Sequence, residues 1–317
     1  MVQAINDHGP PRCLKNPLSR QMILAIGEIL FDVFPDYRRL GGAPFNFAFH
    51  LKQLGFPVRF VSRIGDDRNG KDIRAIVKDR GFDPADLQID PCHATGEVDI
   101  RLDLQGVPTF DILPNVAYDH IDFTAALESL LEDCTLIYFG SLAQRTDYGF
   151  KNLQRILCAR KPQTKCLYDI NFRPGGFRRQ AVFDSLRHAD LLKLNEEELQ
   201  GLKEMHADTR SDDDFVAFLR ECYTIEEVAL TRGHRGSTLF TAAGRFDAAT
   251  PPLEAIADTV GAGDAFASVL AAGYLRGRPP AKTLDAASFL ASRLCTVAGA
   301  IPEDNGFYAD VIQLLER

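Results

Sequence analysis

The chain has no tryptophan and no long uninterrupted apolar run. A membrane-spanning helix needs about 18 or more consecutive apolar residues, and no segment of this sequence reaches that length. The opening segment, residues 1–21, also lacks the continuous apolar core that is typical of a signal peptide. We therefore expect no membrane partner, and we interpret residues 1–21 as a flexible leader to a single domain over residues 22–317.

Lys and Arg are outnumbered by Asp and Glu. The 317 residues carry 36 Lys and Arg against 44 Asp and Glu, which gives a net charge of −8. Surfaces that bind nucleic acid or anionic lipid depend on clustered Lys and Arg, so this balance argues against both partners. A small anionic substrate stays compatible with it, because a local site can be positive on an acidic protein.

The cysteines are few, odd in number and scattered. No two of them have the C-x-x-C spacing of a zinc or redox site. Their pattern predicts neither a disulfide framework nor a structural zinc, and it favours a reducing cytoplasm. The seven positions are Cys13, Cys92, Cys134, Cys158, Cys166, Cys222 and Cys295.

What the chain does contain is a regular alternation of two patterns. Short apolar runs are typical of strands that are buried on both faces, as in a parallel sheet; they are Met22–Ile26, Val58–Ser62, Thr135–Phe139, Cys166–Ile170, Asp190–Leu194 and Glu227–Leu230. Between them lie helical patterns at Lys71–Arg80, at Phe123–Glu132 after a predicted cap at Asp122, and at Tyr148–Arg160 after a predicted cap at Asp147. This alternation predicts a doubly wound, mostly parallel sheet with helices on both faces.

One stretch departs from that pattern. In Glu97–Leu104 apolar and charged residues alternate strictly, Gln105-Gly106 offers a turn, and Phe110 and Ile112 resume the alternation. Such alternation predicts a strand with one face in water. We expect an antiparallel hairpin that stands off the main sheet, with a further strand from Glu28–Phe34. This hairpin is either a lid or an ordinary edge hairpin. If it is a lid, its apolar face covers a ligand, meets another subunit, or does both.

The most informative motif is Asp258–Asp264, because it precedes a segment that is apolar on nearly every side. That segment predicts a buried helix. Gly261 and Gly263 fall at its start, where unpaired N–H groups and the helix dipole attract anions. Asp264 would repel a phosphate that is only bound there, but it would serve as a base where a hydroxyl attacks the phosphate. The alternative is an acidic residue that helps to cap a core helix.

A second constellation, Gly41–Ala48, places two glycines before Pro44, a residue that suits the first turn of a helix. Asn46 is surrounded by apolar neighbours, so we expect it to be buried or to face a ligand. Buried amides need hydrogen-bond partners, and sugar hydroxyls would provide them. A purely structural role for Asn46 is the alternative.

A third segment only imitates a nucleotide-binding motif. Gly65–Lys71 has the glycine and lysine spacing of a P-loop, but Asp72 stands where that motif needs a magnesium-binding hydroxyl. We interpret this segment as a surface turn at the start of a helix.

Two polar motifs each follow a predicted strand. Asn195 and Glu198 either cap the next helix or hold water around a magnesium ion that bridges nucleotide phosphates. Thr231–Gly236 is either a plain hairpin turn or a loop along a nucleotide, with Arg232 facing a phosphate.

Taken together, these residues resemble the ribokinase-type (PfkB) family of carbohydrate kinases from Ile23 to about Pro302. The N-terminal signature is carried by Gly42–Asn46, Ala48, Gly55 and Gly65, and the C-terminal signature by Asp258–Asp264 and Ser268, with a departure at Val269. The motifs Asn195-x-x-Glu198 and Thr231-x-Gly233-x-x-Gly236 also fit. Within the family the fructokinase branch looks most similar, on Gly27–Asp32, Gly41–Pro44 and Asp169–Arg173. The aromatic residue, often Trp, that the branch has after that Arg is represented here only by Phe177.

The resemblance implies a ribokinase-like three-layer αβα sandwich with a small β lid, formed by residues 28–40 and 96–113. It implies Asp264 as the catalytic base, and the N–H groups of Gly261, Ala262 and Gly263 as an anion hole. The sugar would be held by Asp32, Gly42 and Asn46, with Arg173 on sugar or phosphate. ATP would lie along Thr231, Gly233 and Gly236 with Gly299 near its base, Mg²⁺ would bind through water at Asn195 and Glu198, and K⁺ at Asp258 and the Val260 carbonyl. A homodimer through the lid is a further expectation.

These implications favour ATP-dependent phosphorylation of fructose. A 2-keto-3-deoxygluconate kinase is the nearest alternative, and a cationic contact for the substrate carboxylate would distinguish it. A nucleoside kinase is less favoured because the lid offers no evident slot for a base. A non-catalytic sugar sensor would need a lost base or a disrupted anion hole, and a dehydrogenase would need G-x-G-x-x-G after the first strand.

Overall fold

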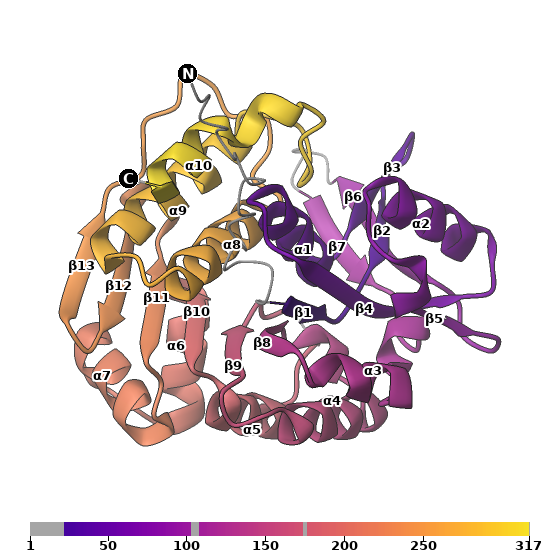
Figure 1. Ribbon diagram of the computed structural model, residues 1–317, viewed down its shortest axis with the longest axis horizontal. Coiled ribbons are helices and arrows are strands. Elements are labelled where there is room, and N and C mark those ends of the chain that lie inside the picture. The colour runs from indigo at the N-terminus through magenta and orange to yellow at the C-terminus, as the bar shows by residue number, and fades with distance from the viewer. Residues whose placement is uncertain (1–21, 103–107, 174–175, 317) are drawn as a thin grey trace, which may run out of the picture.

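The computed structural model describes residues 22–102, 108–173 and 176–316 (Figure 1). The predicted leader, residues 1–21, and the predicted turn at Gln105-Gly106 lie outside the described residues. The chain forms a nine-stranded sheet covered by helices on both faces, and a second sheet of four strands beside it. The predicted three-layer αβα sandwich with a small β lid is therefore confirmed.

The larger sheet has the strand order β13-β12-β11-β10-β9-β8-β1-β4-β5. Its neighbours are parallel except for the pairs β11–β12 and β12–β13. The strands are β1 (Met22–Ile26), β4 (Val58–Gly65), β5 (Leu87–Asp90), β8 (Cys134–Phe139), β9 (Lys165–Asp169), β10 (Leu191–Asn195), β11 (Glu227–Thr231), β12 (Ser237–Thr241) and β13 (Gly244–Ala248).

The helices divide between the two faces of this sheet, as Figure 1 shows. One apolar core joins the sheet to α1 (Ala43–Gln53), α2 (Arg68–Asp79), α8 (Ala262–Leu275), α9 (Pro280–Leu294) and α10 (Ala309–Glu316). The other joins it to α3 (Ala125–Leu131), α4 (Asp147–Ala159), α5 (Arg179–His188), α6 (Glu196–His206) and α7 (Asp212–Tyr223). In β1, Ile23 and Ala25 belong to the first core while Leu24 and Ile26 belong to the second, which is why this strand reads as a continuous apolar run.

Each predicted strand of the main sheet is present, with its bounds shifted by a few residues at most. Two predicted helix caps are wrong. Thr124 and Thr146 accept the capping hydrogen bonds of α3 and α4, in place of Asp122 and Asp147. A Thr hydroxyl and a carboxylate one or two residues away are both good caps, so the sequence alone does not separate them. The P-loop imitation is the start of α2, where Asp67 caps the N–H of Gly70.

The sheet order reverses around β1, which lies between β4 and β8. The chain moves outward to β5 on one side and to β13 on the other. In open α/β sheets, ligands bind outside the carboxyl ends of the strands at such a reversal. The topology therefore selects the ends of β1, β8 and the strands next to them as the place to look for a site.

The smaller sheet has the order β3-β2-β6-β7 and contains β2 (Leu30–Val33), β3 (Arg38–Gly41), β6 (Gly96–Leu102) and β7 (Pro108–Ile112). Its β6–β7 hairpin is antiparallel as predicted, and β2 joins it in parallel with β6. Val98 and Ile100 are each 5% exposed and pack against Val116, Tyr118 and Leu142 of the same chain. The described part of the apolar face is thus already covered within this chain, so it gives no independent support to a dimer.

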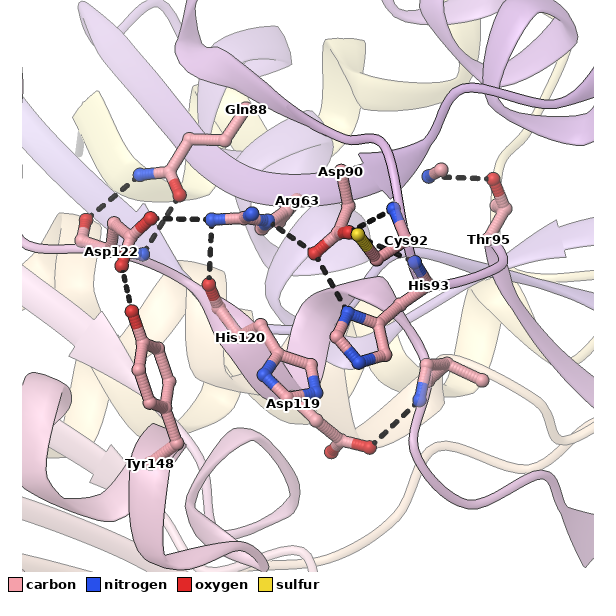
Figure 2. Close-up of polar contacts among 12 residues, drawn as sticks. Arg63, Gln88, Asp90, Cys92, His93, Thr95, Asp119, His120, Asp122 and Tyr148 are labelled. Atoms are coloured by element: carbon pink, nitrogen blue, oxygen red, sulfur yellow. Dashed lines mark hydrogen bonds and ion pairs between the residues drawn. The ribbon is translucent and has the colours of Figure 1, made fainter.

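Two chain segments connect the hairpin to the main domain, residues 91–95 before β6 and residues 113–121 after β7. A polar network holds these two segments together (Figure 2). The N–H of Ala117 donates to the carbonyl of Ala94 at 2.8 Å, which joins the two segments directly. Beside it the rings of His93 and His120 stack at 3.7 Å, and Arg63 donates to the His120 carbonyl at 3.0 Å.

A buried ion pair secures the second of these segments. Arg145 binds Asp119 through Nε at 2.7 Å and Nη2 at 2.8 Å, and Nη2 also donates to the carbonyl of Leu113, directly after β7. Asp119 is fully buried and also accepts the N–H of Val116 at 3.1 Å. The end of the hairpin and the short helix η3 (Ala117–His120) are therefore held by one ion pair, Arg145–Asp119.

We expect Arg145→Met to lower the free energy of unfolding by about 3–5 kcal/mol, because it leaves the Asp119 charge buried without its partner. Arg187→Met is the matched control, since its ion pair with Asp184 leaves the arginine side chain 61% exposed. Exposed pairs contribute about 0–1 kcal/mol. Urea unfolding of both variants measures the difference, and equal losses would contradict the anchoring role of Asp119.

Candidate active site

The start of α8 lies next to the carboxyl ends of the central strands. Gly261 caps this helix with a φ of 79°, and a Cβ at that position would lie 2.4 Å from the Cβ of Ala300. No other residue fits there without strain. The first turn of a helix presents N–H groups that have no partner inside the helix. Of the three predicted donors, that of Ala262 is used by the Thr259 carbonyl at 3.3 Å.

Asp264 is the third residue of α8 and is 9% exposed. The Nδ2 atom of Asn46, in the first turn of α1, donates to its Oδ2 atom at 2.8 Å. The structure thus brings together two residues that were predicted from motifs 218 positions apart. The packing of α1 against α8 in one core makes this contact possible.

The electrostatics of Asp264 suit a general base. Burial, with a smaller contribution from the charge of Asp169, raises the pKa of Asp264 to about 7, against the lowering effects of Asn46, Lys193 and Arg173. A base works best when its pKa lies near the working pH. Among the described residues, Asp264 binds the Asn46 side chain and no backbone N–H of the helix start, so the structure gives no support to the capping interpretation.

Sequence reasoning missed a buried trio below this helix. Lys193 donates from Nζ to Asp169 Oδ1 at 2.9 Å, and the Tyr138 hydroxyl donates to Asp169 Oδ2 at 3.0 Å. A Cβ built on Gly263 would lie 3.0 Å from Lys193 Nζ, so this ammonium group adjoins the first turn of α8. The signal was a lysine within the apolar strand Leu191–Asn195, where a charge is unexpected unless it has a partner.

The residues predicted for the sugar lie on the lid side of Asp264. Gly42 caps α1 with a φ of 113°, and a Cβ there would lie 2.5 Å from the carbonyl oxygen of Glu28. Burial raises the pKa of Asp32, on β2, to about 6, while Arg173 and Arg39 act in the opposite direction. Arg173 also lowers the pKa values of Asp264 and Glu28, so its charge acts on all three carboxyl groups.

Glu28 is a second residue that the predicted site did not include. It is 3% exposed, and burial raises its pKa to about 7. Its Oε2 atom and the Oδ1 atom of Asn46 are both buried without a hydrogen-bond partner in the described structure. Buried polar atoms are normally satisfied, so these two acceptors, one of them on the side chain that binds Asp264, indicate a place for a polar ligand.

The predicted nucleotide residues gather farther along the same edge of the sheet. Asn195 and Thr231 are directly paired in the β10–β11 ladder. Asn195 and Glu198 form a reciprocal capping box at the start of α6, and Thr231–Gly236 lies in the hairpin between β11 and β12. The helix cap and the hairpin turn, which were the structural alternatives for these two motifs, are therefore both present. The proposed nucleotide contacts would be additional to them.

Glu198 does not fit a direct metal ligand. Its Oε2 atom accepts the N–H of Asn195 at 2.7 Å and its Oε1 atom accepts that of Phe172 at 3.2 Å. Each carboxylate oxygen retains a further lone pair for a water molecule, which fits the predicted binding of Mg²⁺ through water. Among the residues that the structure describes, no group of three or more His, Cys, Asp or Glu side chains could hold a metal ion.

Asp258 does not fit the predicted K⁺ ligand. Its Oδ1 atom accepts the N–H of Val260 at 3.1 Å, and its Oδ2 atom accepts both the N–H of Gly299 and Nη1 of Arg39 at 3.0 Å. A cation bound here would meet the positive charge of Arg39 at short range. The same contacts place Gly299, predicted near the base of ATP, beside the loop that leads into α8.

A three-layer α/β fold with a buried carboxyl group at a glycine-lined helix start agrees with the predicted phosphoryl-transfer enzyme. The family model described as pfkB family carbohydrate kinase matches residues 32–305, and the chain belongs to that family. Fructokinase-1 of Zea mays is 25% identical, over 94% of this chain and 98% of its own length. The protein is thus a sugar kinase.

Solved structures agree on the fold. Fructokinase from Xylella fastidiosa with bound ATP has a TM-score of 0.79 at 20% identity, over 94% of this chain and 98% of its own. Fructokinase from Vibrio cholerae O395 in its fructose-, ADP- and calcium-bound form has a TM-score of 0.74 at 22% identity, over 92% of this chain and 99% of its own. In the described ranges, none of the helices has the length and apolar character needed to cross a membrane.

We expect Lys193→Met to lose stability because the Asp169 charge stays buried without its ammonium partner, and to lower kcat about 10²-fold because the anion hole loses a preorganised charge. The double variant Lys193→Met/Asp169→Asn removes both charges and provides the control. Its thermal unfolding should return toward that of the wild type while its kcat stays low. Recovery of kcat together with stability would show that Lys193 serves the fold alone.

Proposed function

We propose that this protein transfers the γ-phosphoryl group of Mg-ATP to fructose, with Asp264 as the general base. The observation that carries the proposal is the position of Asp264, which is buried beside Asn46 in the first turn of an anion-binding helix end. A carboxylate in that place opposes simple anion binding and suits proton removal from an attacking hydroxyl.

The reaction follows from this arrangement. Asp264 takes the proton of the sugar hydroxyl as its oxygen bonds to the γ-phosphorus, and the bond from that phosphorus to the β,γ-bridging oxygen breaks to release ADP. The N–H groups of Gly261 and Gly263 and the ammonium of Lys193 stabilise the charge on the transferring group. Arg173 adds an exposed guanidinium whose charge acts on Asp264. Glu198 and Asn195 would hold a magnesium ion through water, and that ion would neutralise charge on the phosphates.

The acceptor is best explained as a neutral polyol. Glu28 and Asn46 offer unpartnered buried oxygens, and Asp32 adds a partly buried carboxyl. Hydroxyl groups are the donors that such acceptors need. An anionic acceptor such as 2-keto-3-deoxygluconate would face the carboxyl groups of Glu28, Asp32 and Asp264 together, with Arg173 and Arg39 as the cationic side chains on that side.

Fructose itself is proposed on the relatives, whose names include fructokinases from plants and bacteria. The bound ATP of the Xylella fastidiosa structure and the fructose, ADP and calcium of the Vibrio cholerae structure support ATP and a divalent cation here. A sugar sensor without activity is disfavoured because Asp264 and the glycine start of α8 are both intact. A homodimer through the lid sheet stays a prediction.

The test is an ADP-release assay with fructose, ribose, adenosine and 2-keto-3-deoxygluconate in Mg-ATP. We expect the highest kcat/KM on fructose, and we expect Asp264→Asn to lower kcat by about 10²- to 10⁴-fold, as the loss of a general base typically does. Higher kcat/KM on 2-keto-3-deoxygluconate would replace fructose by the sugar acid. Unchanged kcat in folded Asp264→Asn would contradict the assigned base.

A further inference from the structure

A lid residue forms an ion pair with the loop that leads into the anion hole. Arg39, on β3, donates from Nη1 to Oδ2 of Asp258 at 3.0 Å. Asp258 lies three residues before Gly261, and its Oδ1 atom already fixes the loop by accepting the N–H of Val260. The contact joins the smaller sheet to the start of α8 across 219 positions of sequence.

The guanidinium of Arg39 is held in place from several sides. It lies over the ring of Tyr37 at 4.9 Å and that of Phe34 at 5.7 Å, and these two rings stack on each other at 4.4 Å. Its Cδ atom would be 3.6 Å from a Cβ built on Gly299. A long cation that is packed in this way loses less freedom when it pairs than one that extends into water.

Arg39 also faces the sugar side of the site. It is the direct partner of Asp32 in the β2–β3 ladder, and it lowers the pKa of that carboxyl group. One side chain therefore adjoins both the carboxyl group proposed for the sugar and the carboxylate that shapes the phosphoryl-binding loop. Its neighbour Arg38 instead pairs with Asp72 on α2, away from the site.

We propose that Arg39 is a tethered cation that takes the place of a free monovalent cation at Asp258, so that closure of the lid orders the anion-hole loop without K⁺. Only the kinetic consequence of this proposal rests on the proposed function. The geometric basis is that three donors occupy the two oxygens of Asp258, and that one of them carries a full positive charge. Arg39 is thus a positioning residue, which acts on the reacting phosphoryl group through Asp258 and the loop.

The kinetic test compares about 100 mM K⁺ with about 100 mM tetramethylammonium in the ADP-release assay, so that the ionic strength and its screening are the same in both salts. We expect the kcat of the wild type to change by less than about twofold between the two salts. Arg39→Ala should lose about tenfold in kcat, equivalent to about 1.4 kcal/mol, and K⁺ but not tetramethylammonium should recover part of it. Arg39→Lys should lose less than Arg39→Ala, because it keeps the charge. Arg38→Ala, which removes a lid ion pair that ends on α2, should behave as the wild type.

A second readout does not depend on turnover. Hydrogen exchange should become faster over residues 257–263 in Arg39→Ala and not in Arg38→Ala, and Arg39→Ala should add nothing in an Asp258→Asn background. Saturable stimulation of the wild type by K⁺ of fivefold or more, or equal exchange in the two arginine variants, would overturn the proposal. If no sugar is turned over, the exchange experiment still tests the tether, so failure of the proposed function can be told apart from failure of this inference.

Discussion

The burial of one carboxylate, Asp264, at the start of an apolar helix is the constraint on which the site depends. A charge at that depth is costly without partners, and the chain supplies Asn46 from α1 and Lys193 from β10, against the like charge of Asp169 on β9. Asn46 donates to it directly, and the Lys193–Asp169 pair sets the surrounding field. Each partner comes from a different element, so the chemistry of the site depends on how α1 and α8 pack on the sheet.

The topology explains why these partners meet. β1 lies where the sheet order reverses, so the segments that follow β1 and β9 reach the same edge as the first turn of α8. The lid sheet grows from one of these segments, directly after Gly27 and Glu28, and returns to the main domain at α1. The chain thus links β2 and β3 directly to Gly42 and Asn46, and the Arg39 ion pair links β3 to Asp258.

The sequence predicted the structural features that depend on periodicity and local motifs. The strands, the hairpin, the buried helix after Gly261 and the burial of Asn46 all follow from patterns within a few residues. It did not predict contacts that only the fold creates. The Lys193–Asp169 pair joins two strands, and the Arg39–Asp258 pair joins two sheets, so neither has a local signature. The K⁺ ligand role of Asp258 does not fit the structure for the same reason, since its competing cation comes from a distant strand.

The most direct test of the central claim is the pH dependence of the free energy of unfolding for the wild type and Asp264→Asn. The pKa of Asp264 rises from an ordinary 3.8 in the unfolded chain to about 7 in the fold, so its contribution to stability is present below pH 4 and is lost as the pH rises through 7. Glu28 and Asp32 titrate in both proteins and cancel. The free energy of unfolding of Asp264→Asn should rise relative to that of the wild type between pH 4 and 7, by up to about 4 kcal/mol. Above pH 7 the difference should stay constant. Parallel curves across this range would contradict the claim that Asp264 is a buried base poised near neutral pH.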